Sequence, residues 1–322
     1  ELDILNEFRA LIHTPNKSNS YKCIWAKAII EASLEDIEDG IVPLTFISET
    51  FIDAFWNLLT FSKLNQSNNT AAQPEFSRLV STLIGEFVLI FTQEPPLPFY
   101  KAKAYIESNE NLSRVYEKTV SDGVKSLKKD VAHRFLNLNN EVSWFYEYDK
   151  LNNYLKFDQE VLACIKKYSS MLQDSVTLAW ATFVEDHDNS PKIIKKLSQA
   201  SDGSVAKRKS LTKFKTFLDL ENSTHTCFKC VQPIHDTPAI DHVLPWSYIY
   251  SDDLFNLVYV HQTCNSSKGN QIPTQDTVHR LLERNKRLLA LMLSQNSNKK
   301  QTEELRLSLE HNWLQKNYIQ LT

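Results

Sequence analysis

Two pairs of metal-binding side chains bracket one short part of the chain. Cys227 and Cys230 are separated by two residues, and His261 and Cys264 repeat that spacing further along. A gap of two residues lets both members of a pair reach one tetrahedral zinc ion, and four such ligands close a structural site without a bound water. The spacing therefore predicts a structural Zn²⁺ held by these four side chains.

The segment between and just after these pairs carries the groups that hydrolysis of a phosphodiester requires. His242 is a candidate general base, because an imidazole exchanges protons near neutral pH. Asp241 and Asn265 offer hard oxygen ligands for a catalytic Mg²⁺ or Mn²⁺. Asn256 is expected to tie the intervening loop to the backbone near His242, and Lys268 is a candidate phosphate contact. The pattern favours hydrolysis over a zinc finger that only binds.

The local sequence predicts a ββα unit around these groups. Residues 239–244 and 257–260 are rich in β-forming side chains, and a helix is expected from residue 262. Neighbouring residues of a strand point to opposite faces, so Asp241 and His242 can share a cleft only if the strand is distorted or ends there. Because the unit is too small for its own core, a zinc crosslink would stabilise it.

This constellation resembles the HNH, or ββα-metal, endonuclease family. Asp241 and His242 match the family's Asp-His pair, Asn256 matches its central Asn, and Asn265 matches its last Asn or His. The resemblance covers about residues 226–273. The flanking sequence is similar to that of a bacterial subgroup in which a helical region precedes a zinc-stapled nuclease domain. The similar segments are residues 241–248, 253–258 and 265–268.

The resemblance implies an endonuclease that hydrolyses DNA, with double-stranded DNA favoured, and leaves 5′-phosphate and 3′-hydroxyl ends. By this resemblance His242 is the general base, Asp241 and Asn265 bind one divalent ion, and Asn256 orients the catalytic loop. One departure is His261, where many zinc-bearing members have a cysteine, although an imidazole is an acceptable zinc ligand. If His261 faces DNA instead, either His225 or His235 could take its place as the fourth zinc ligand.

The charge of the chain is distributed unevenly. Residues 192–322 contain 18 Lys and Arg against 12 Asp and Glu, whereas residues 1–191 contain 18 against 27. A basic field concentrates phosphate polyanions, and an acidic region is poorly suited to nonspecific DNA contact. The charge pattern therefore favours a nuclease in the C-terminal third and a different role for the acidic region before it, for which docking of a protein partner is a candidate.

Composition predicts a mainly α fold. The chain has 322 residues, 42% of them apolar, and only 5 glycines. Apolar spacing predicts helices that include residues 112–118, 124–136, 273–293 and 302–318. We expect four regions along the chain. They are a helical domain (residues 1–190), a basic connector (191–222), a zinc-stapled HNH domain (223–275) and C-terminal helices that brace the HNH domain (276–322).

Two basic segments outside the ligand pairs have two interpretations each. Lys207, Arg208 and Lys209 in the connector form either a solvated linker or an arm that contacts phosphate. The helix expected at 273–293 carries an arginine face, which is either plain solvated surface or a contact to a DNA backbone phosphate. Trp246, with its neighbour Tyr248, is expected to pack locally and not to stack on bases.

The cellular setting is predicted from cysteine use and hydropathy. Five cysteines, three of them in the ligand pairs, favour a reducing cytoplasm over a disulfide framework. No run of eighteen apolar residues occurs, which disfavours a membrane span.

Three functions remain open. The first is a metal-dependent endonuclease, and the second is a zinc-stapled module that binds nucleic acid or protein without cutting. In the third, the acidic helical region is a sensor or adaptor with the nuclease as its effector. A role in restriction or anti-phage defence rests on analogy with similar chains.

Overall fold

The computed structural model describes residues 1–13, 19–62, 64–69, 73–91, 97–129, 131–138, 141–188, 190–202, 210–269, 271–295 and 299–321. Lys207, Arg208 and Lys209 lie outside the described residues. The chain divides into two compact units, one of Glu1–Asp188 with Ile193–Ala206 and one of Asn189–Lys192 with Lys207–Thr322. The described part contains sixteen α-helices and seven short strands, which confirms the mainly α fold.

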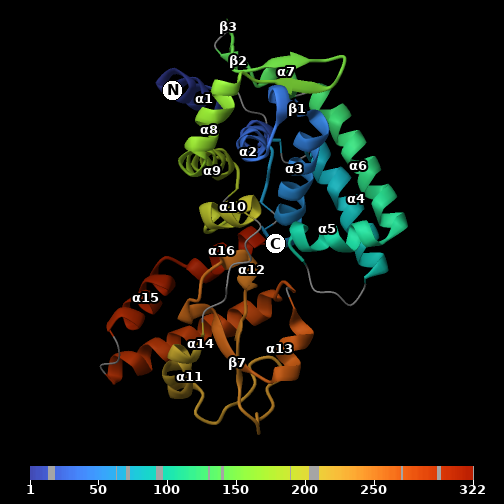
Figure 1. Cartoon of the computed structure of the whole chain (residues 1–322). Coiled ribbons are helices and arrows are strands. Elements are labelled where there is room, and N and C mark those ends of the chain that lie inside the picture. Colours follow the sequence, from blue (N-terminus) through green and yellow to red (C-terminus); the bar gives the residue numbers. More distant parts are fainter. Residues whose placement is uncertain are drawn as a thin grey trace. The chain divides into compact units, whose positions relative to one another are not determined.

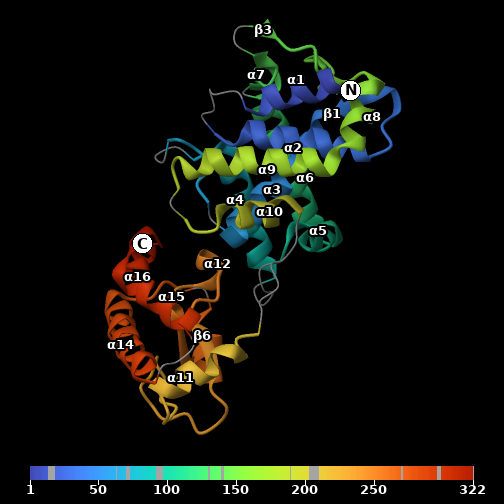
Figure 2. The same ribbon diagram turned by 90° about the vertical axis from the view of Figure 1, so that its left-hand side faces the viewer.

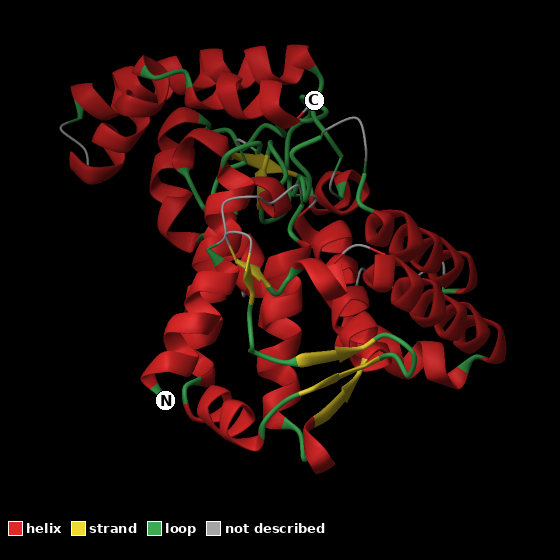
Figure 3. Cartoon of the chain, turned by 90° about the horizontal axis from the view of Figure 1, so that it is seen from above, coloured by secondary structure: helices red, strands yellow, loops and turns green. Residues whose placement is uncertain are grey.

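The first unit is a helical assembly with short strands at one edge. Its strands form a three-stranded sheet in the order β1-β5-β4 and a separate β2-β3 pair, all antiparallel. Figure 3 shows these strands in yellow among the helices. The elements are α1 (Leu2–Ile12), α2 (Tyr21–Leu34), β1 (Ile41–Pro43), α3 (Leu44–Asn57), α4 (Glu75–Ile90), α5 (Phe99–Ser108), α6 (Glu110–Lys129), α7 (Val131–Arg134), β2 (Asn137–Leu138), β3 (Glu141–Val142), β4 (Glu147–Asp149), β5 (Tyr154–Lys156), α8 (Gln159–Lys167), α9 (Ser169–Glu185) and α10 (Ile193–Asp202).

Helix α2 lies at the centre of this unit. Eleven of its 14 residues are buried, so it is apolar on nearly all sides, as expected of a helix inside a core. It packs on α3 and on α9, and α3 packs in turn on α4 and α6 (Figures 1 and 2). Lys27 is fully buried within this core and pairs with Glu31 one turn later. Such a lysine needs its ionic partner, because an unpaired buried charge is costly.

Helix α6 differs from the sequence-based expectation. The sequence predicted separate helices at 112–118 and 124–136, but one helix runs from Glu110 to Lys129. Gly123, in the gap between the two predicted helices, allows close packing without interrupting the helix. A Cβ at this position would clash with the Ser48 hydroxyl and approach the Phe76 ring. The glycine therefore lets α6 lie tightly against α3 and α4.

The second unit is built around one antiparallel strand pair. Its core gathers apolar side chains from β7, α14, α15 and α16, among them Leu257, Leu281 and Leu288. Among the described residues, no helix combines the length and apolar character needed to cross a membrane. The elements are α11 (Lys215–Glu221), β6 (Ala239–His242), α12 (Trp246–Ile249), β7 (Leu257–Val260), α13 (Gln262–Lys268), α14 (Gln275–Ser294), α15 (Lys299–Glu310) and α16 (Trp313–Leu321).

Helix α14 braces the strand pair through buried polar side chains. Arg284 donates to the Leu257 carbonyl, and Asn285 Nδ2 donates to the Phe255 carbonyl over 2.8 Å. The helix predicted at 302–318 is divided into α15 and α16, because Asn312 adopts a left-handed conformation with φ 54°. Both helices pack on α14.

The stretch predicted as a basic connector contains two helices. Helix α10 packs on α9 and belongs to the first unit, whereas α11 packs on α14 in the second unit. The basic side chains of this stretch are therefore carried partly on ordered elements.

Candidate active site and metal centre

Four potential zinc ligands converge in the second unit. The ligand atoms of Cys227, Cys230, His261 and Cys264 all lie within 4.8 Å of one another. His261 Nδ1 lies 3.4 Å from Cys230 Sγ and 3.9 Å from Cys264 Sγ. A tetrahedral zinc with bonds of about 2.0 to 2.3 Å separates its ligand atoms by roughly 3.5 to 3.8 Å. The cluster is therefore compatible with one Zn²⁺.

Local backbone geometry positions the first cysteine pair. The Cys227 amide donates to the Gln232 carbonyl and the Val231 amide donates back to the Cys227 carbonyl, both over 2.9 Å, with Val231 left-handed at φ 60°. The Phe228 amide donates to the Tyr259 carbonyl over 2.9 Å, which ties this tight turn to β7. The cysteine pair is thus fixed to the strand that precedes the second ligand pair.

The second ligand pair lies at the beginning of α13. His261 is the N-cap of α13 and Cys264 lies in its first turn, a spacing that places both on one face. His261 Nε2 lies 3.0 Å from the Pro233 carbonyl. Donation from Nε2 to that carbonyl leaves Nδ1 as the nitrogen directed at the sulfurs, as is typical of zinc-bound histidines. His225 instead pairs with Asp219 over 2.9 Å.

The cysteine thiols differ in their acidity. Burial raises the pKa of Cys227, but backbone donation from Cys230, His261 and Lys229 outweighs it and lowers the pKa to about 6. The pKa of Cys264 is raised to about 11, first by burial and then by Cys227 and Cys230. Like charges disfavour a second thiolate, and a divalent cation removes that penalty. The electrostatics therefore fit a resident cation.

The Asp-His pair lies at the end of β6. The register pairs Asp241 with Val258 and His242 with Leu257, and β6 ends at His242. Beyond this point Asn256 holds the chain, because its side chain accepts from the Leu244 amide over 2.8 Å and donates to the Leu244 carbonyl over 3.0 Å. Asn256 is fully buried.

A second carboxylate, which sequence reasoning missed, contacts the imidazole. Asp252 Oδ1 lies 3.0 Å from His242 Nε2 and accepts from Trp246 Nε1 over 3.1 Å. The His242 side chain is 7% exposed and that of Asp252 15% exposed, so the pair is largely shielded from water. Trp246 also stacks on Tyr250 with ring centroids 4.9 Å apart, which is local packing. An acidic residue ten positions after a histidine gives no sequence signal.

Helix α13 brings two predicted site residues to the same edge. It packs on β6. From its last turn, Lys268 Nζ donates to Asp241 Oδ2 over 2.9 Å and also contacts the His242 carbonyl. Asn265 lies three residues earlier and therefore on the same face as Lys268. An ammonium group thus lies against the carboxylate that was predicted to bind a divalent ion.

Comparison with known families agrees with this geometry. A family model described as HNH endonuclease matches residues 234–274. The match covers β6, β7 and α13 with the Asp-His pair, and it confirms the resemblance inferred from the sequence. Residues 234–274 of the chain therefore match the HNH endonuclease family. No curated protein matched the chain, and no solved structure matched it either.

Proposed function

We propose that the protein is a metal-dependent endonuclease that cleaves DNA. The observation that supports this most strongly is the Asp241-His242 pair at the end of β6, opposite α13, inside a segment that matches the HNH family. The proposal assigns cutting to the second unit.

His242 is the proposed general base. A water oxygen attacks phosphorus, its proton passes to the His242 imidazole, and the bond to the 3′ oxygen breaks. The departing 3′ oxygen takes a proton from a solvent water, which leaves 5′-phosphate and 3′-hydroxyl ends. Asp252 is a proposed positioning residue, because its carboxylate lies 3.0 Å from Nε2 and favours the protonated ring. Asn256 holds the loop from its buried position.

Asp241 and Asn265 are the proposed ligands of one catalytic Mg²⁺ or Mn²⁺. Carboxylate and amide oxygens suit these hard cations, which neutralise charge on the scissile phosphate when bound. Lys268 would have to release Asp241 when the cation binds, and its ammonium would then be available for phosphate. Cys227 and the three other ligands of the cluster are proposed to hold a structural zinc.

The remaining assignments are also proposals. Double-stranded DNA is the favoured substrate, given the basic charge of residues 192–322. The cytoplasm is the favoured compartment, because no disulfide links the cysteines of the described residues. The acidic helical unit is proposed to dock a protein partner, and a restriction or anti-phage role remains an analogy.

A plasmid-nicking assay tests the proposal. The wild-type protein is expected to nick supercoiled DNA with Mg²⁺ or Mn²⁺, and His242→Ala is expected to lose about 10²- to 10⁴-fold in rate, the usual contribution of a positioned base. His235→Ala is the matched control, because this histidine is exposed and is not one of the four converging ligands. Circular dichroism checks that both variants fold.

Two outcomes would contradict the proposal. Equal nicking by the wild type and His242→Ala would remove His242 from the mechanism. If neither protein cut DNA, although both bound it, the second function would be favoured, a zinc-stapled module that binds without cutting. The intact Asp-His pair is the feature that supports cleavage over binding alone.

A further inference from the structure

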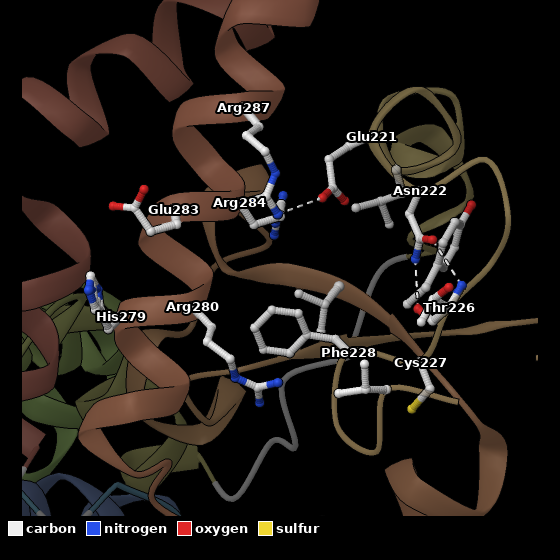
Figure 4. A pocket seen from close by; sticks show the side chains of 14 residues that line it. Glu221, Asn222, Thr226, Cys227, Phe228, His279, Arg280, Glu283, Arg284 and Arg287 are labelled. Carbon is white, nitrogen blue, oxygen red and sulfur yellow. Dashed lines mark hydrogen bonds and ion pairs between the residues drawn. The ribbon is translucent and has the colours of Figure 1, made fainter. Parts of the chain in front are cut away.

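A pocket of about 470 Å³ lies within the second unit, apart from the proposed cutting site. It is enclosed by α11, the turn that carries Cys227, strand β7 and helix α14 (Figure 4). Its lining includes Cys227 and Phe228 but not Asp241, His242 or Asn265. The pocket is therefore a second feature of the nuclease domain that the proposed hydrolysis does not use.

Three arginines from one helix line this pocket. Arg280, Arg284 and Arg287 are spaced four and three residues apart on α14, which places them on one helix face. Figure 4 shows all three on the side that faces α11 and Phe228, and Glu283 of the same helix also belongs to the pocket lining. The sequence alone favoured an ordinary solvated face for these arginines.

Arg284 is the deepest of the three. Only 2% of the residue is exposed, and one of its terminal nitrogens donates to the Leu257 carbonyl. Its Nε and Nη1 atoms are buried without a hydrogen-bond partner among the described residues. Burial lowers the pKa of this guanidinium to about 10, so it remains charged at neutral pH. A buried, charged donor without a partner is costly unless an acceptor reaches it.

The negative charges around the pocket do not balance the arginines. Two carboxylates, Glu221 and Glu283, line the pocket with three arginines, and Glu221 on α11 lies 3.4 Å from Arg287. Glu283 is paired with Lys286 over 2.8 Å. Asp276 lies 3.8 Å from Arg280, but its side chain is 86% exposed and screened by water. The pocket therefore has an excess of positive charge.

The opposite wall of the pocket is apolar and includes an aromatic ring. The Arg280 guanidinium carbon lies 4.9 Å from the centroid of the Phe228 ring. Leu218, Val231 and Val258 complete this wall. An apolar wall with a ring beside clustered guanidinium groups fits a ligand with both a planar ring and a phosphate.

We propose that this pocket binds the 5′-phosphate of a nucleotide, either a free mononucleotide or the phosphorylated end of a DNA strand. The phosphate oxygens accept from Arg280 and Arg287, and the ligand's negative charge compensates the buried Arg284. The base lies against the apolar wall beside Phe228. A phosphomonoester suits this arrangement, because the Arg280 and Arg287 side chains are 40% and 64% exposed and can reach a ligand, whereas the charge of Arg284 is buried and needs a compensating anion within the pocket.

Calorimetric titration of the full chain, without added divalent ion, tests the proposal through binding and not through cleavage. The probes are 2′-deoxyadenosine 5′-monophosphate and a short oligonucleotide with either a 5′-phosphate or a 5′-hydroxyl. Arg280→Gln and Arg287→Gln are each expected to weaken binding by about tenfold or more, the loss of one charge-assisted hydrogen bond. Lys316→Gln is the matched control, because this exposed lysine belongs to the second unit and lies outside the pocket lining. Arg284 is left intact because it also braces β7.

The two sources of the phosphate give different results. Binding of the phosphorylated oligonucleotide, but not of its hydroxyl form, supports a strand end as the ligand. Binding of the mononucleotide alone supports a free nucleotide. No binding of any probe at millimolar concentration, or equal binding by the wild type and both arginine variants, would overturn the proposal. Neither result depends on whether His242 cuts DNA.

Discussion

Replacing Asp252 by Asn removes the negative charge beside His242 while keeping the size of the side chain. In the wild type Asp252 Oδ1 lies 3.0 Å from His242 Nε2 and also accepts from Trp246 over 3.1 Å. The amide oxygen of an asparagine can still accept one of these hydrogens, so the loop keeps a polar anchor. The substitution therefore tests the charge of Asp252 more than its packing.

The expected loss follows from the strength of the contact. A hydrogen bond to a charged group contributes about 1.5 to 3 kcal/mol, and the largely shielded position of both side chains favours the upper part of this range. If Asp252 stabilises the imidazolium formed as the proton is taken, this free energy is lost mainly in the transition state. The rate constant kcat should then fall by roughly 10- to 100-fold, with little change in KM.

Single-turnover cleavage of a labelled duplex with saturating Mg²⁺ measures this loss. Asp253→Asn is the matched control, because it makes the same change one residue later on a carboxylate that bonds Ser251. The argument fails if Asp252→Asn cleaves at the wild-type rate, or if Asp253→Asn is impaired to the same degree. A rise in KM with unchanged kcat would assign Asp252 to DNA binding and contradict its positioning role.

Two further predictions concern metal and pH. The wild type is expected to hold about one zinc ion per chain, and mass spectrometry should find less zinc in Cys227→Ser. The second unit of this variant should also unfold at a lower temperature, because structural zinc contributes directly to folding. Full zinc content in the variant would contradict this prediction. In the first unit, burial raises the pKa of Asp53 from 3.8 to about 6, against the opposing effect of Lys27. The folded state then keeps a proton that the unfolded state loses, so stability should fall by up to about 3 kcal/mol as pH rises from about 4 to 6. Asp53→Asn should flatten this dependence in urea denaturation, and an unchanged profile would exclude Asp53 as its source.

Local spacing was sufficient for the features that depend on a few neighbouring residues. Cys227 and Cys230 share one turn, and His261 and Cys264 share the first turn of α13, so each pair could be predicted without knowledge of the fold. The strand pair and the helix after it could be predicted for the same reason. The position of α14 could be predicted from its apolar spacing.

Features that depend on contacts between distant residues could not be predicted. Asp252 reaches His242 only because α12 and the left-handed Tyr250 turn the chain back on itself. Arg284 has the polarity of a surface residue, yet it is buried because α14 packs across β7. Gly123 lies between two helices that were predicted as separate, but its role depends on Ser48 of another helix. In each case the contacting residue is too far away in the sequence to be found from a local sequence pattern.

Cys264 and Asn265 are adjacent in α13, and this adjacency has a consequence for the binding of the two proposed metal ions. One residue belongs to the zinc cluster and the next is a proposed ligand of the catalytic ion, so the same short helix would carry both metals. Under the proposed function, zinc occupancy orders the helix and thereby raises the affinity for Mg²⁺ or Mn²⁺. Because such coupling is reciprocal, the catalytic ion would slow zinc dissociation by the same linkage, and the domain would behave as a two-metal cooperative unit.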